Sequence, residues 1–86
     1  MFNPAAAAKV AKEILGEKPE LLEQWAKQAE TDPSGVRQII MKMANDHGVK
    51  LSEGGLKMAL AAAKPFLGKL AEKSREAAEL LIKRIS

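Results

Sequence analysis

The sequence contains no cysteine, no tyrosine and very few aromatic residues. Without a thiol the chain can form neither a disulfide bond nor a thiolate metal site, and this composition suits a reducing compartment, so we expect the protein to be cytoplasmic. Aromatic residues make up only 3% of the chain. β-Sandwiches and barrels are usually rich in aromatic and β-branched residues, so this scarcity argues against an all-β fold.

Long apolar runs are also missing. The longest uncharged stretch in the second half covers residues 58–63, well short of the ~18 residues that a membrane-spanning helix needs. The N-terminal residues 1–4 lack the basic and apolar regions of a secretory signal. We therefore expect no transmembrane segment and no leader. Met1 favours a native N-terminus, whereas Ser86 follows an apolar helix without a stop signal, as a cut end would.

The sequence has helix-starting residues, chiefly proline, at intervals of about one short helix. Pro4, Pro19, Pro33 and Pro65 each precede a run with helical apolar spacing, and proline is well tolerated at the first position of a helix. Ser52, a good N-cap, adds a fifth start. The 86 residues therefore predict one all-α domain that spans the whole chain. Its expected form is a compact bundle of five short helices, or of four with a C-terminal helix kinked at Pro65.

Further signals set the expected helix bounds. Asn3 and Asp32 are N-cap candidates. Gly16 is expected to end the first helix in the left-handed conformation, and Gly48 to end the third. The expected helices cover residues 4–15, 19–30 and 65–85, with a third from residue 33 to the stop at Gly48 and a fourth that follows Ser52 and breaks or kinks at Pro65. The helix over residues 65–85 is expected to be the longest and the most strongly amphipathic.

Apolar residues recur at spacings of three and four in every segment and predict the buried faces. The predicted core consists of Ala7, Val10, Ala11, Ile14, Leu21, Leu22, Trp25, Ala26, Ala29, Val36, Ile39, Ile40, Met43, Leu56, Leu60, Ala63, Leu67, Leu70, Ser74, Ala78, Leu81 and Ile85, with Phe66 and Ile82 flanking the last helix's seam on its two sides. Trp25 is expected to be the largest side chain of this core. Phe2 with Ala7, and Leu51 with Leu56, occupy the positions of hydrophobic staples at two helix starts.

No motif for catalysis or metal binding stands out. His47, the only histidine, is expected on the apolar side of the third helix near its C-terminus, where a protonated imidazole would favourably meet the helix dipole. Asp46 alone cannot complete a metal site with it. Ser52, the nearest hydroxyl, serves as a cap rather than as a nucleophile. We therefore predict no enzyme activity, no metal, no cofactor and no small-molecule substrate.

Three apolar side chains lie away from the predicted buried faces, namely Met41, Met58 and Leu80. Exposed flexible apolar side chains suit adaptable contacts with other proteins. The sequence thus favours a non-enzymatic protein–protein interaction or assembly module, whose partner is another protein or a second copy of the chain. Scattered apolar residues are also normal on protein surfaces, so this pattern alone does not decide the matter.

The alternative is a small nucleic-acid-binding protein that resembles a helix-turn-helix in its third and fourth segments. Residues 50–86 carry eight basic and four acidic side chains, and such an excess can attract phosphate. The candidate contacts are Lys50, Lys57, Lys64, Lys69, Lys73, Arg75, Lys83 and Arg84. Against this reading, the connection between the two segments is long, and the fourth segment offers only lysine, which contacts backbone better than bases.

Overall fold

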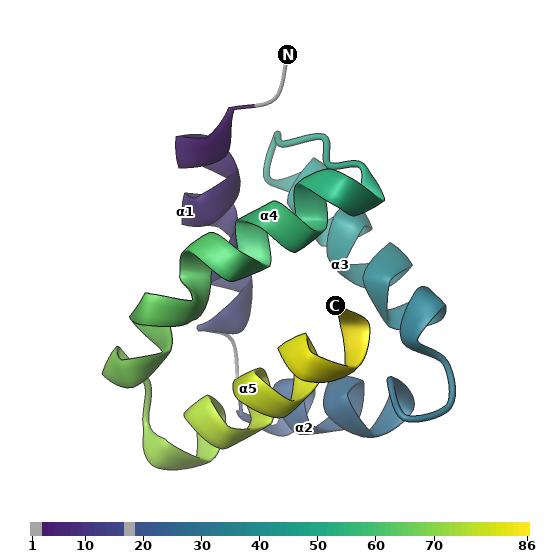
Figure 1. Ribbon diagram of the computed structural model, residues 1–86, viewed down its shortest axis with the longest axis vertical. Coiled ribbons are helices and arrows are strands. Elements are labelled where there is room, and N and C mark those ends of the chain that lie inside the picture. The colour runs from purple at the N-terminus through teal and green to yellow at the C-terminus, as the bar shows by residue number, and fades with distance from the viewer. Residues whose placement is uncertain (1–2, 17–18) are drawn as a thin grey trace.

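Helices account for most of the described chain. The computed structural model describes residues 3–16 and 19–86, and within them it contains five α-helices, one short 3-10 helix and no strand. The elements are α1 (Pro4–Leu15), α2 (Pro19–Gln28), α3 (Pro33–Asp46), α4 (Glu53–Ala63), the 3-10 helix η1 (Lys64–Lys69) and α5 (Glu72–Ile85). The predicted all-α fold of five helices is confirmed (Figure 1).

Side-chain caps explain why three of the helices begin where they do. Asn3, Asp32 and Ser52 each accept a hydrogen bond from the backbone N–H three residues later, at 3.2, 3.0 and 3.1 Å respectively. Each bond satisfies one of the N–H groups that the first turn of a helix leaves without a partner. These three predicted caps are confirmed.

Glycine follows α1 and α3, but the two positions differ. Gly48 has a φ of +85°, the left-handed region in which glycine has no steric penalty, and the next N–H, that of Val49, returns to Ala44 O at 2.9 Å. Gly16 has a φ of −83°, so the left-handed conformation expected there is wrong. Its N–H instead continues the helical ladder to Lys12 O at 2.9 Å, which any residue could do.

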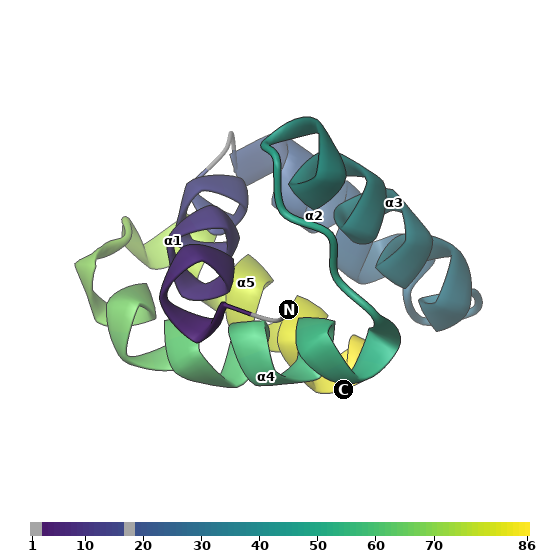
Figure 2. The same cartoon turned by 90° about the horizontal axis from the view of Figure 1, so that it is seen from above.

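The helices form two main pairs, with α5 lying along α2 and α4 crossing α1 (Figure 1). The third helix, α3, contacts the other four α-helices and lies on the side of the molecule opposite η1, as Figure 2 shows from above. A buried core joins all five helices, and its largest fully buried side chains are Ile14, Leu15, Leu22, Val36, Ile40, Leu56, Leu60, Leu81, Ile82 and Ile85. Trp25 belongs to this core, as predicted.

The C-terminal helix departs from the prediction. The expected helix over residues 65–85 does not form, because Pro65 continues α4 as the 3-10 helix η1, and the break falls later. Leu70 and Ala71 are extended, with ψ of 157° and 148°, and α5 then begins without a side-chain cap. α5 therefore has 14 residues, the same length as α3. The predicted seam survives this break, since Leu67 and Ser74 are buried and Leu70 packs against the core.

The buried face of α3 is also displaced from the prediction. The buried residues are Val36, Ile40 and Ala44, at successive spacings of four. Ile39 was expected inside but is 36% exposed, whereas Met41 was expected outside but is half-buried and packs against the core. α3 contacts the other four α-helices, so side chains on both flanks of its central stripe can reach a neighbour.

A half-buried arginine joins three helices. Arg37 Nη1 on α3 donates to Ile85 O at 3.2 Å, and its Nε lies 3.9 Å from Glu53 Oε1 at the start of α4. Ile85 O belongs to the last turn of α5, where carbonyl groups lack an intrahelical donor. Arg37 therefore holds the end of α5 against α3.

Two further sequence expectations concern membranes and the staples. None of the helices within residues 3–16 and 19–86 is both long and apolar enough to cross a membrane.

Leu51 packs against the core beside α4, where Leu56 is buried, as a staple requires. Phe2, the outer member of the other predicted staple, lies outside the described residues.

Candidate functional site

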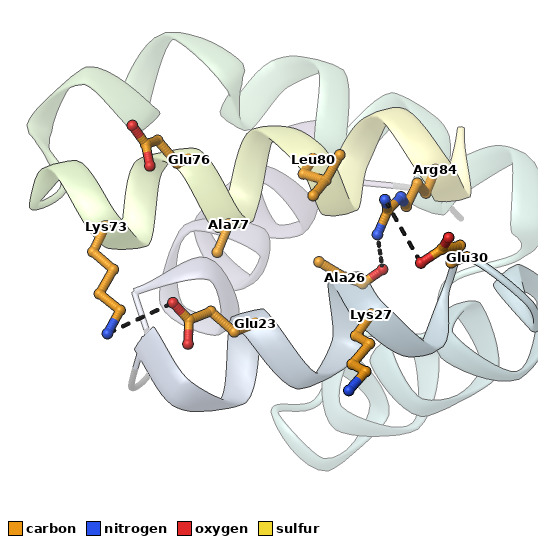
Figure 3. A pocket seen from close by; sticks show the side chains of 9 residues that line it. All are labelled: Glu23, Ala26, Lys27, Glu30, Lys73, Glu76, Ala77, Leu80 and Arg84. Carbon is orange, nitrogen blue, oxygen red and sulfur yellow. Dashed lines mark hydrogen bonds and ion pairs between the residues drawn. The ribbon is translucent and has the colours of Figure 1, made fainter.

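A surface groove runs between α2 and α5. It has a volume of about 290 Å³. The residues that line it are Glu23, Ala26, Lys27, Glu30, Lys73, Glu76, Ala77, Leu80 and Arg84 (Figure 3). Ala26 and Ala77 are buried and form the apolar floor, because their small side chains leave a depression between the two helices. Leu80 rises beside this floor and stays 42% exposed.

Polar contacts fasten both ends of this groove. At one end, Lys73 Nζ on α5 lies 3.7 Å from Glu23 Oε1 on α2. At the other end, Arg84 Nη1 donates to Ala26 O at 2.6 Å, and its Nη2 lies 4.0 Å from Glu30 Oε2 (Figure 3). Arg84 therefore supplies a donor to the last turn of α2, whose carbonyls lack one within the helix. The groove thus lies between two helices that share the buried core, with Arg84 as a further tie at one end.

The three predicted contact residues do not form one surface. Leu80 lies in the α2/α5 groove, as described above. Met58 is 60% exposed on α4 and lines a separate hollow with Ala6 and Val49. Met41 packs partly against the core, so the expectation that it projects from the surface is wrong in part. Of the three, Leu80 is the one held in a groove between two fastened helices.

The eight predicted basic contacts are also dispersed. Lys73 and Arg84 line the α2/α5 groove and bind acceptors on α2, and Arg75 is half-buried. Five lysines are exposed and form no ion pair with another described residue, namely Lys50, Lys57, Lys64, Lys69 and Lys83. Lys64 of η1 and Lys83 of α5 line one hollow of about 560 Å³ together with Glu79. Lys50 lines a different one, next to Met58.

The segment from α3 to α4 has some features of a helix-turn-helix and lacks others. Ala44 is buried and Gly48 is left-handed, as that motif requires of its packed alanine and its turn glycine. However, six residues, 47–52, separate α3 from α4, and α4 packs mainly across α1. Its first residues are Glu53 and two glycines, and none of them is an arginine, asparagine or glutamine that could read a purine.

His47 lies at the surface rather than on the apolar side of α3. It is the C-cap of that helix, and its Nδ1 lies 3.4 Å from Glu13 Oε2 on α1. The pair connects the end of α3 to α1, which is a structural role. Within residues 3–16 and 19–86, no three histidine, aspartate or glutamate side chains come together as metal ligands would.

Sequence reasoning missed the two arginines that hold the helix ends. Arg37 and Arg84 bind carbonyls 48 and 58 residues away along the chain, so no local spacing indicates either contact. The sequence predicts a phosphate contact at Arg84 instead. Arg84 lies in the last turn of α5, and a basic residue there also interacts favourably with the helix dipole, so its position alone does not indicate a contact with α2.

Comparison with known proteins gives no relative for this chain, because no family model, no curated protein and no solved structure matches it.

Proposed function

We propose that this protein is a non-enzymatic protein-binding module and that the α2/α5 groove is its contact surface. The observation that carries the proposal is Leu80, a large apolar side chain kept 42% exposed over a floor of two buried alanines. An apolar centre inside a charged rim is the usual anatomy of a protein interface. Truncation of such a central apolar side chain often removes much of the binding energy.

The contact between α2 and α5 supports the same proposal. Core packing and the hydrogen bond from Arg84 to Ala26 O hold α2 and α5 together before any partner arrives, and the exposed Lys73–Glu23 pair adds little. Binding to a preformed surface orders fewer groups, so more of the contact energy remains as affinity. Met58 is more exposed than Leu80, but it projects from one helix without such ties around it.

The proposal is tested by comparing two matched substitutions in extracts of cells that produce the protein. Leu80→Asp places a charge at the centre of the groove, and Met58→Asp makes the same kind of change at an exposed site on α4. Because a weak complex dissociates on dilution, the proteins are crosslinked in the cells before lysis. We expect wild type and Met58→Asp to elute in gel filtration at a mass above that of the monomer, and Leu80→Asp to elute as a monomer. Identical elution of all three proteins would contradict the proposal, provided that circular dichroism shows equal helix content.

A second candidate function is binding to the nucleic-acid backbone. It is supported by the five exposed lysines that have no ion-pair partner among the described residues, two of which, Lys64 and Lys83, share one hollow. Phosphate binding releases counterions and therefore weakens steeply with salt. Anisotropy of labelled duplex DNA at about 50 and 200 mM salt tests this candidate. Binding that collapses at the higher salt, and that Lys64→Glu and Lys83→Glu weaken, would support it, and no binding at either salt would remove it.

A further inference from the structure

The charged rim of the α2/α5 groove has a direction. One end carries Glu23, Lys73 and Glu76, and the other carries Lys27, Glu30 and Arg84 (Figure 3). The first end thus has two carboxylates and one ammonium group, whereas the second has one carboxylate and two cations. The groove is therefore net negative where α2 and α5 begin and net positive where they end.

Two copies of this groove are complementary when they face each other in opposite directions. Glu76 precedes Leu80 by four residues and Arg84 follows it by four, so the three lie near one another along α5. If two copies of α5 pair antiparallel about Leu80, each Glu76 lies opposite the Arg84 of the other copy. Leu80 lies between Glu23 and Lys27 along the groove (Figure 3), so the same axis places each Glu23 opposite a Lys27.

A twofold axis across the groove produces this arrangement, since an isologous contact places one patch against its own copy with reversed direction. It brings the two Leu80 side chains together above the buried floors. A parallel arrangement would instead set acid against acid and base against base, which is unfavourable across an interface. The order of charges in the groove therefore selects both the occupant and its direction.

We infer that a second copy of this chain occupies the α2/α5 groove in a twofold dimer centred on Leu80. This inference rests on the proposed function and names its partner. The apolar centre contains only Ala26, Ala77 and Leu80, and stable interfaces bury ~1,200 Å² or more. The dimer is accordingly weak, and we expect it to form from roughly 0.1 mM protein upward.

Two charge reversals test the arrangement without disturbing the folded monomer. Lys27 and Glu76 line the groove, and neither forms an ion pair with another described residue. Lys27→Glu makes both ends of the groove negative, and Glu76→Lys makes both ends positive. By sedimentation equilibrium we expect each variant alone to dimerise about five- to tenfold more weakly than wild type, because attraction across the axis becomes repulsion. An equimolar mixture of Lys27→Glu with Glu23→Lys should regain association as a heterodimer, because each contact between positions 23 and 27 across the axis then joins an acid to a base. Glu23→Lys gives up only the exposed contact with Lys73.

Matched controls carry the same charge changes outside the groove. Lys57→Glu on α4 is the control for Lys27→Glu, and Glu79→Lys on α5 is the control for Glu76→Lys. Both should dimerise as wild type does. Dimerisation of wild type should also weaken between about 0.05 and 0.5 M salt, because exposed charges are screened. Controls that lose association as strongly as the groove variants, or a mixture that remains monomeric, would overturn the inference.

The proposed function and this inference can fail separately. If purified wild type stays monomeric up to about 1 mM, ten times the concentration expected from the size of the interface, the inference is wrong. If Leu80→Asp then still removes the higher-mass species from cell extracts, the groove binds a different protein, and the proposed function stands. If Leu80→Asp changes neither measurement, both are wrong.

Discussion

Replacement of Arg84 by methionine should measurably loosen the helix pair that forms the groove. The guanidinium donates to Ala26 O at 2.6 Å, and its side chain is only 29% exposed. Methionine keeps an unbranched apolar stem of similar length, so packing against the helices is largely retained while the charge and the donors are lost. The substitution therefore isolates the polar tie between α5 and the end of α2.

The expected cost follows from these contacts. A hydrogen bond from a charged donor contributes ~1.5–3 kcal/mol, and partial exposure of Arg84 places its bond at the lower end of that range. The contact with Glu30, at 4.0 Å and with the Glu30 side chain 67% exposed, adds little because water screens it. We expect Arg84→Met to lower the free energy of unfolding by about 1–2 kcal/mol. For a domain of this size, that corresponds to a fall in Tm of roughly 5–15 °C.

Thermal and urea unfolding, followed by circular dichroism, measure this loss. Lys83→Met is the matched control, because Lys83 is the exposed neighbour on α5 and forms no ion pair with another described residue. The control should change stability by less than about 0.5 kcal/mol, as exposed surface substitutions usually do. Equal stability of the Arg84 and Lys83 variants would refute the argument that Arg84 holds the end of α2.

Two other predictions concern backbone conformation and capping, and urea unfolding measures both. Gly48→Ala should cost about 1 kcal/mol because φ is +85° there, whereas Gly54→Ala, in the first turn of α4 with open space around it, should stabilise by up to about 1 kcal/mol. Effects of the same sign at both glycines would contradict this reasoning. Asp32→Ala should destabilise by about 1 kcal/mol through loss of the cap bond to Gly35 N, while Ser34→Ala, exposed in the same turn, should have little effect. An equal loss in both variants would refute the cap.

Local chemistry explains why much of the fold could be predicted. At three helix starts, a side chain accepts a hydrogen bond from the backbone amide three residues later. Asn3, Asp32 and Ser52 could therefore be identified from residue type and from their position before an apolar helical pattern. The core positions predicted in α1 and α4 from apolar periodicity are all buried, although Leu15 and Ala59 are buried as well and lie outside the predicted pattern. Information of this kind lies within one helix, where sequence patterns are most reliable.

Predictions failed where the outcome depends on distant residues. The break at Leu70 and Ala71 has no capping side chain, glycine or proline at those two positions, whereas Pro65, the obvious signal, sits inside a continuing turn. The exchange between Ile39 and Met41 reflects how α3 is placed among four neighbouring helices, which its own sequence does not encode. The exposure of Leu80 was predicted correctly, but the groove around it requires α2 and α5 to meet.

A photo-crosslinking amino acid placed at position 80, and at position 57 as a control, most directly tests whether the α2/α5 groove contacts a protein. Both positions are exposed, one inside the groove and the other on α4. We expect a discrete protein adduct from position 80 in intact cells and none from position 57. The mass of the adduct shows whether the groove contacts a second copy or another protein. Adducts from neither position, or the same adducts from both, would contradict it.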